Sequence, residues 1–217
     1  MGFGNVQINS LYVQNSRGKF ESEYMEALVQ IMLSLGKYAT DVLLFTSQEF
    51  DYFGVEDSVV TGSSIMPHKR NLDPLEILRG NMSVVVANQL MIKDVAKNLI
   101  SGYSRDFQLI KKPLIESTNI VEDSIAVAGV VLSKLTPKPE SIRAKIRKSI
   151  FTADVANDLV ALKGVPFRDA YKQAASIKVG SIDLLKNIKS KKSIGAPGNL
   201  SLSLLRKRTR RSGKIGR

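Results

Sequence analysis

The sequence predicts an all-α fold, in which a bundle of long helices is followed by a small helical domain. Apolar residues recur every three or four positions along three long stretches of the 217-residue chain. No run alternates apolar and polar residues long enough to require a sheet. Shorter helical segments, separated by glycine and proline, follow the third stretch. We therefore expect a partial central bundle over residues 1–136, a small helical domain over 137–183 and a basic tail over 184–217.

The first long helix is expected between Phe20 and Phe50. One apolar row is spaced 3-4-3-4-3 along it, and a second row repeats every seven residues. Two rows predict burial on more than one side, so this helix should need several partners, as in the interior of a bundle. The first row is Met25, Leu28, Met32, Leu35, Ala39 and Val42, and the second is Tyr24, Ile31, Tyr38 and Phe45.

The second long helix is expected to begin at a clear start signal and to end near Ile100, before Gly102. Asp73 is the expected N-cap, Pro74 the first helical residue, and Glu76 stands where it can complete a capping box. The predicted buried face is Leu75, Leu78, Met82, Val85, Ile92, Ala96 and Leu99.

The third long helix is expected from Pro113 to about Leu135, where a proline-rich stretch ends it. Its predicted buried face is Leu114, Val121, Ile125, Ala128, Leu132 and Leu135. Shorter helices are then expected over 140–149, 152–163 and 166–177, and they form the small second domain.

The positive charge is concentrated at the end of the chain. Residues 184–217 contain 11 basic and no acidic residues, so they supply almost all of the net charge of +12. A near-neutral body with a basic tail argues against a folded groove-binding domain for nucleic acid. Glycine, proline and the mutual repulsion of like charges predict a disordered tail. We expect this tail to bind nucleic acid only weakly and in a strongly salt-dependent way.

Composition also limits the compartment and the cofactors. The chain has no cysteine and a single histidine, which excludes disulfides and makes a zinc site improbable. We expect no metal and no organic cofactor. The start of the chain lacks the pattern of a signal peptide, and no apolar run approaches the ~20 residues of a membrane span. These features predict a soluble, cytoplasmic protein without a membrane partner.

The chemistry is expected in the long loop 51–73, in the ten residues GSSIMPHKRN from Gly62 to Asn71. This stretch combines a permissive glycine, two hydroxyls, the cation of Lys69 and an amide, directly before a helix start that favours negative charge. The residues alone leave two alternatives, a loop that binds carboxylate or phosphate and a solvated turn.

The stretch resembles the GSSxMPxKxN signature of the fumarase/aspartase superfamily at every fixed position. The resemblance implies that Ser63 is the general base that removes a proton beside a substrate carboxylate. It also implies that Lys69 faces the dianionic intermediate and that Asn71 binds substrate. His68 is assigned no catalytic role. Leu72 departs from the family, which usually has proline at that position.

Three further segments resemble argininosuccinate lyases within this superfamily. Residues 103–111, YSRDFQLIK, are similar to a substrate-contacting segment, which implies that Tyr103, Gln108 and Lys111 bind substrate. TADVA at 152–156 and KGVPFR at 163–168 are similar to two segments of the carboxyl-terminal domain of that family. The similarity extends over about residues 9–177.

The resemblance implies reversible elimination of argininosuccinate to arginine and fumarate, in arginine biosynthesis, by a homotetramer. The family's amino-terminal domain, its threonine–histidine pair and its first long helices have no counterpart here. We therefore expect activity to need an amino-terminal portion or companion chain. Two alternatives remain open: an adenylosuccinate lyase, since MPHKRN with histidine and arginine is common in that branch, and a non-catalytic helical assembly subunit.

Overall fold

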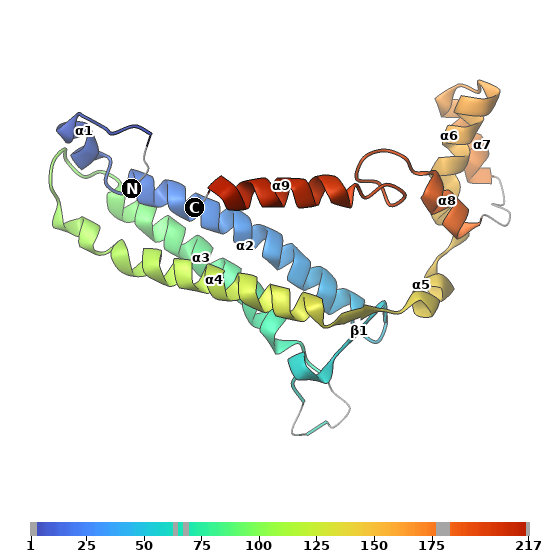
Figure 1. The fold of residues 1–217 in the computed structure, drawn as a ribbon, viewed down its shortest axis with the longest axis horizontal. Coiled ribbons are helices and arrows are strands. Elements are labelled where there is room, and N and C mark those ends of the chain that lie inside the picture. Colours follow the sequence, from blue (N-terminus) through green and yellow to red (C-terminus); the bar gives the residue numbers. More distant parts are fainter. Residues whose placement is uncertain (1–3, 63–64, 67–69, 177–182, 216–217) are drawn as a thin grey trace. The chain divides into compact units, whose positions relative to one another are not determined.

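The computed structural model describes residues 4–62, 65–66, 70–176 and 183–215, and it divides the chain into two compact units (Figure 1). The first unit is residues 1–144 and the second is residues 145–217. The division therefore lies later in the chain than the boundary after residue 136 that the proline-rich stretch suggested. The prediction of an all-α fold is confirmed, with two short strands in addition.

The first unit is a bundle of three long helices with short elements at its ends (Figure 1). In chain order its elements are α1 (Ser10–Asn15), α2 (Lys19–Phe45), β1 (Phe53–Val55), the 3-10 turn η1 (Asp57–Val59), α3 (Asp73–Ala96), the 3-10 turn η2 (Arg105–Gln108), α4 (Lys111–Ser133), β2 (Leu135–Pro137) and α5 (Pro139–Lys145).

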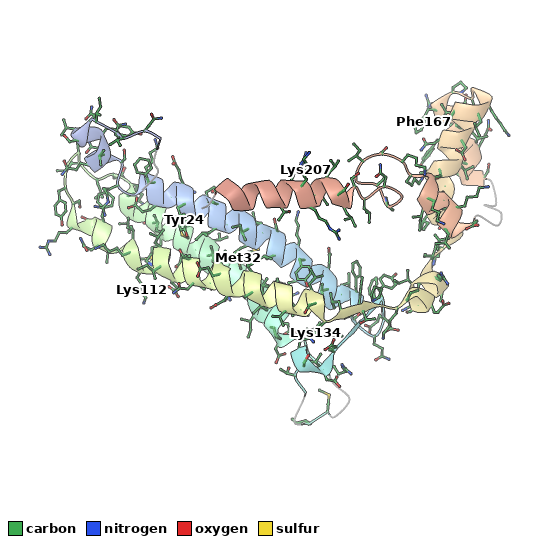
Figure 2. All side chains as sticks on the ribbon, in the orientation of Figure 1. Tyr24, Met32, Lys112, Lys134, Phe167 and Lys207 are labelled. Carbon is green, nitrogen blue, oxygen red and sulfur yellow. The ribbon has the colours of Figure 1, made fainter. Side chains whose placement is uncertain are left out.

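Helix α2 packs against both α3 and α4. Met25, Met32 and Ala39 of its first apolar row are fully buried, and Met32 lies within the bundle in Figure 2. Tyr24 and Ile31 of the second row stay exposed. The amino-terminal half of the second row thus stays exposed, whereas Tyr38 and Phe45, in its other half, are partly buried.

By length and composition alone, α2 is also apolar enough to cross a membrane, which differs from the expectation that no stretch is. One such helix is weak evidence, because a helix in the core of a globular protein passes the same test. The buried first row places part of α2 in such a core.

Helix α3 begins as predicted near Asp73, but the predicted cap is wrong. The N-cap is Leu72, and no side chain caps the helix. The Asp73 carboxylate instead accepts a hydrogen bond from the Thr61 hydroxyl, so it is drawn toward the preceding loop. Leu75, Val85 and Ile92 form the buried face, as their spacing predicted.

The buried face of α4 differs from the prediction. Ile125 and Leu132 are exposed, whereas Val131 and two serines, Ser117 and Ser124, are buried. The buried positions follow a 3-4 spacing. The prediction nevertheless selected the larger apolar residues of this helix, whereas small residues occupy several of its buried positions. Small side chains suit this face because they let two helix backbones approach closely.

The two strands also depart from the expectation that no sheet forms. β1 and β2 pair in antiparallel fashion, with Phe53 opposite Pro137 and Val55 opposite Leu135. Each strand has only three residues, too few for an alternating pattern to be visible in the sequence. The pair joins the end of α4 to the loop that follows α2.

Among its described residues, the second unit contains the 3-10 turn η3 (Lys148–Phe151) and the helices α6 (Thr152–Lys163), α7 (Phe167–Ser176), α8 (Leu184–Ser190) and α9 (Leu202–Ile215). Gly164 ends α6 with a left-handed backbone, at a φ of 66°. Helices α6 and α7 pack together through Ala156, Leu159, Ala170 and Ala174.

The tail differs from the predicted disorder, since it contains α8 and α9. Asp183 caps α8 by accepting hydrogen bonds from the backbone N–H groups of Leu185 and Lys186. A turn follows, in which the Asn199 amide donates to the Lys192 carbonyl. Local capping and turn bonds therefore supply order that the charge and the glycine content do not suggest.

Candidate functional site

The loop that carries the signature is closed at its base by a two-residue bridge. The backbone N–H of Thr61 donates to the Asn71 carbonyl at 2.9 Å, and the N–H of Asn71 donates back at 3.0 Å. This bridge fixes the positions of Thr61 and Asn71 relative to each other. Asn71, which was predicted to bind substrate, is therefore held by its backbone at the start of α3.

The side chain of Arg70, next to the predicted catalytic Lys69, already has two partners. Its guanidinium donates to the Val55 carbonyl at 2.9 Å and forms an ion pair with Asp57. Both partners belong to the segment of β1 and η1. Arg70 thus helps to fix the base of the loop, and its charge is partly neutralised by Asp57.

Ser63 and Lys69, the predicted base and the predicted cation of the intermediate, lie outside the described residues. The same holds for His68. Their roles stay predictions. Asp73 and Glu76 stand in the first turn of α3, where two carboxylates complement the positive end of the helix dipole.

A polar cavity of about 250 Å³ lies beside the base of the loop. Two cations line it, Arg70 and Lys138. Each is paired with an acidic residue, since Lys138 lies 2.5 Å from Asp51 and Arg70 pairs with Asp57. The cavity is therefore a poor site for a further anion.

The second predicted set of site residues lies on the connector between α3 and α4. Tyr103 is 68% exposed and precedes η2, Gln108 ends η2, and Lys111 begins α4. Tyr103 lines a cavity of about 510 Å³, but Gln108 and Lys111 do not. Within one chain the structure thus places one of these three side chains in a cavity.

Asn71 precedes the first residue of α3 and Tyr103 follows its last residue, so the two lie toward opposite ends of this long helix. Figure 1 shows α3 running along the bundle. The 24 residues of this helix, at about 1.5 Å of rise each, separate the two ends by about 36 Å. A small substrate cannot reach both ends at once. If both predicted sets contact the same substrate molecule, they must come from different copies of the chain.

The sequence patterns did not single out the residues that complete the larger cavity. Gln14 and Arg17 line it from the α1 side, and Phe107 lines it from η2. Asn15 links the α1 segment to the connector after α3, because its side-chain oxygen accepts a hydrogen bond from the Gly102 N–H at 2.9 Å. The only available signal was a cluster of amide and cationic side chains directly before a long helix.

The acidic residue of this connector is held in its charged form. A hydrogen bond from the Ser104 hydroxyl, followed by a backbone hydrogen bond, lowers the pKa of Asp106 below its usual value. Among the described residues, no three His, Cys, Asp or Glu side chains gather in a way that could hold a metal ion. The expectation of metal-free chemistry stays a prediction.

Residues 3–87 match the family described as Lyase. Curated relatives extend the similarity over most of the chain. An argininosuccinate lyase of Thermotoga neapolitana is 39% identical over 175 residues, which are 81% of this chain. The chain is therefore similar to lyases along most of its length. Argininosuccinate lyases of Xylella fastidiosa and of Xanthomonas campestris pv. campestris are 36% and 37% identical over 211 residues, or 96% of the chain.

The chain spans less than half of the length of those relatives. It covers 44% of the Thermotoga neapolitana protein, 47% of the Xylella fastidiosa protein and 48% of the Xanthomonas campestris protein. The matched part includes both predicted sets of site residues.

Solved structures support the fold of the chain. EDDS lyase in complex with formate matches with a TM-score of 0.69 at 22% identity, over 80% of this chain and 34% of that one. A fumarate lyase:delta crystallin from Brucella melitensis matches with a TM-score of 0.60 at 22% identity, over 79% and 39% of the two chains. At this identity the likeness concerns the fold alone.

Proposed function

We propose that the chain supplies the carboxyl-terminal part of an argininosuccinate lyase, which converts argininosuccinate reversibly to arginine and fumarate. The observation that carries this proposal is the identity of 36–39% to argininosuccinate lyases over 81–96% of the chain. The complete GSSIMPHKRN signature agrees with it. The reaction belongs to arginine biosynthesis, and we propose a cytoplasmic location for it.

The proposed chemistry is an elimination. Ser63, as an alkoxide, removes a proton from the succinyl carbon beside a carboxylate, and the electron pair is held on that carboxylate as a dianionic intermediate. The bond between the neighbouring carbon and the guanidinium nitrogen then breaks, and its electron pair leaves with that nitrogen as the neutral guanidine of arginine. This guanidine then takes up a proton from solvent. The Lys69 ammonium opposes the developing negative charge, and preorganised charge of this kind is often the largest contribution to catalysis.

The proposed active site is assembled from several polypeptides. The separation of Asn71 from Tyr103 by the length of α3 favours this arrangement, because one substrate spans only a fraction of about 36 Å. We propose a homotetramer that also contains an amino-terminal portion, on the same or a separate chain.

Fumarate release tests the proposal. The chain is mixed with the amino-terminal portion of the Thermotoga neapolitana relative, the part that it does not match, and argininosuccinate is added. We expect fumarate, followed by its ultraviolet absorbance, from the mixture and little from either part alone. Absence of fumarate from every assembly of the chain would overturn the proposal.

The same assay separates the alternatives. The curated relatives reported above are argininosuccinate lyases, so they do not favour adenylosuccinate lyase. Cleavage of adenylosuccinate and not argininosuccinate would reverse that choice. Stable assembly without cleavage of either compound would indicate a non-catalytic helical subunit.

A further inference from the structure

Helix α9 combines exposed leucines with a dense run of cations. Three leucines in its first turn are each about half exposed, and every side chain from residue 202 to residue 209 is exposed. Three cations follow the leucines directly, and the sequence adds three more before the helix ends. The helix has no acidic residue of its own. The leucines are Leu202, Leu204 and Leu205, and the cations are Arg206, Lys207, Arg208, Arg210, Arg211 and Lys214.

The apolar and the cationic side chains meet on one side of α9. By the period of an α-helix, Leu202, Leu205 and Thr209 share this side. Arg206 lies one turn after Leu202, at its edge. The same four residues line a cavity of about 360 Å³. Lys207 lies on the other side of the helix, so cations are available beside the leucines and behind them.

The start of α9 is tied to the turn that precedes it. The Ser201 hydroxyl donates to the side-chain oxygen of Asn199 at 3.0 Å, and the Asn199 amide donates to the Lys192 carbonyl at 2.8 Å. The backbone N–H groups of Leu204 and Leu205 donate to the Ser201 carbonyl. The helix is therefore formed before any partner binds, so association does not incur the full entropy cost of ordering this segment.

This combination favours the surface of an anionic membrane over nucleic acid. A helix with leucines on one side and many cations lies in the membrane interface, with its apolar side buried by about 5–10 Å. Anionic headgroups attract nearby cations, and a guanidinium matches the oxygens of a phosphate. Nucleic acid also offers phosphates, but it offers no hydrocarbon to cover exposed leucines. The 14 residues of α9 extend over about 21 Å, which is too short to cross a hydrocarbon core of about 30 Å.

We propose that α9 attaches the chain peripherally to a membrane surface that contains anionic phospholipids. The leucines of its first turn enter the boundary between headgroups and acyl chains, and its cations bind the anionic groups of the lipids. A peripheral contact of this kind differs from the expectation of no membrane partner, which rested on the lack of a spanning run. It does not depend on the proposed lyase function. Attachment to the negatively charged cytoplasmic leaflet is compatible with the cytoplasmic location proposed above.

Co-sedimentation with vesicles tests the proposal on the 217-residue chain. One set of vesicles is phosphatidylcholine alone, and the other contains equal parts of phosphatidylcholine and phosphatidylserine. We expect the chain to sediment with the second set and to stay in solution with the first. Added salt should weaken the binding, because it screens exposed charges.

Two double variants separate the contributions of the leucines and the cations. Leu202→Ser combined with Leu205→Ser should weaken binding to the anionic vesicles at least tenfold, because less apolar surface enters the membrane. Arg206→Gln combined with Lys207→Gln should also weaken it at least tenfold, because two attractions to the headgroups are lost.

Ile150→Ser combined with Leu162→Ser is the matched control, since both are exposed apolar residues of the same unit outside α9. It should bind as the unaltered chain does. Circular dichroism and sedimentation without vesicles establish that each variant is folded and soluble. A DNA duplex, used in place of the vesicles, should bind weakly and equally to the unaltered chain and to the leucine variant. No binding of anionic vesicles, equal binding of both vesicle sets, or binding within twofold of the unaltered chain in the leucine variant would overturn the proposal.

Tight binding of the duplex together with any of these three results would assign α9 to nucleic acid instead.

Discussion

A serine hydroxyl is a weak base, so the assignment of Ser63 makes a sharp prediction at the level of one residue. Ser63→Ala should lower kcat of the assembled enzyme by at least about 100-fold, because it removes the group that accepts the proton. KM should change little, since the contacts that hold substrate remain. Ser83→Ala, an exposed position on α3, is the control. A kcat within tenfold of the unaltered enzyme would assign the base elsewhere.

Asp154 carries a prediction about pH. Hydrogen bonds from Lys191 and then from Asn187 lower the pKa of this carboxyl, and they fasten α8 to α6. Because the folded pKa is lowered, this contribution to stability is present above the unfolded pKa of about 3.9 and is lost as the pH falls through the lower folded value. Amide exchange of residues 184–190, corrected for intrinsic rates, should therefore rise only in acid.

Asp154→Asn provides the comparison for that experiment. The amide cannot form the ion pair with Lys191, so exchange in α8 should be faster near pH 6 and should lose its acid transition. Asp169→Asn removes a carboxylate from the first turn of α7 and should keep the transition. Equal profiles for the chain and Asp154→Asn would show that the pair does not hold α8.

The sequence predicted some residues of the candidate site and missed others, because local patterns do not report contacts between distant segments. Tyr103 was found through a local resemblance, and the structure places it at a cavity. Arg17 was missed because its environment comes from Phe107, a residue of a different segment, which no local pattern reports. A single sequence contains the chemistry of each side chain but not its distant neighbours.

Two glycines make matched predictions at the level of an element. Gly18 precedes α2 with a φ of 83°, and an added Cβ would lie 2.6 Å from the Cβ of Ala96. Gly18→Ala should therefore lower the free energy of unfolding by about 2 kcal/mol or more. Gly80 lies inside α3 with open space around it. Gly80→Ala should raise that free energy by about 0.5–1 kcal/mol, as measured by chemical denaturation.

The buried serines of α4 form a second matched pair, seven residues apart. The Ser117 hydroxyl accepts a hydrogen bond from the Asn88 amide at 3.1 Å, so Ser117→Ala should cost about 1 kcal/mol. The Ser124 hydroxyl is buried without a partner among the described residues. Ser124→Ala should be neutral or stabilising by up to about 1 kcal/mol, because a buried unsatisfied hydroxyl is unfavourable. Equal losses in both variants, measured by denaturation, would contradict this account.

The long helices were predictable because their apolar spacing repeats over many turns. Short features were not predictable from apolar spacing. The three-residue strands have too few positions for a pattern, and the cap of α3 depends on where the Asp73 carboxylate finds a donor, which is Thr61 in the loop. The buried face of α4 was misassigned because hydrophobicity alone ranks Ile125 above Ser124, whereas close packing favours the smaller side chain.

The molecule as a whole is uneven in charge. Almost all of its net +12 lies in residues 184–217, which the structure describes as α8, a turn and α9 up to residue 215. A helix that concentrates cations still attracts polyanions, and the attraction falls steeply with salt. Weak binding of nucleic acid through this tail stays a prediction, independent of the lyase chemistry.

The bundle exposes apolar side chains that a single chain does not cover. Ile125 is 49% and Leu132 60% exposed, and they lie seven residues apart on one face of α4. Tyr24 and Ile31 repeat this spacing on α2. Exposed apolar rows of this kind usually mark an interface with another polypeptide. They are consistent with a site whose two halves, at Asn71 and at Tyr103, come from different copies.

This face yields the prediction for the whole molecule. The chain should sediment as an oligomer at micromolar concentration, because the apolar rows of α2 and α4 become covered on association. Ile125→Glu combined with Leu132→Glu should shift it to monomer, since a carboxylate buried in an apolar interface is strongly unfavourable. Leu162→Glu, at an exposed leucine of α6, is the control and should leave the oligomer intact. A monomeric unaltered chain at high concentration would mean that the missing amino-terminal portion, and not a second copy, covers these rows.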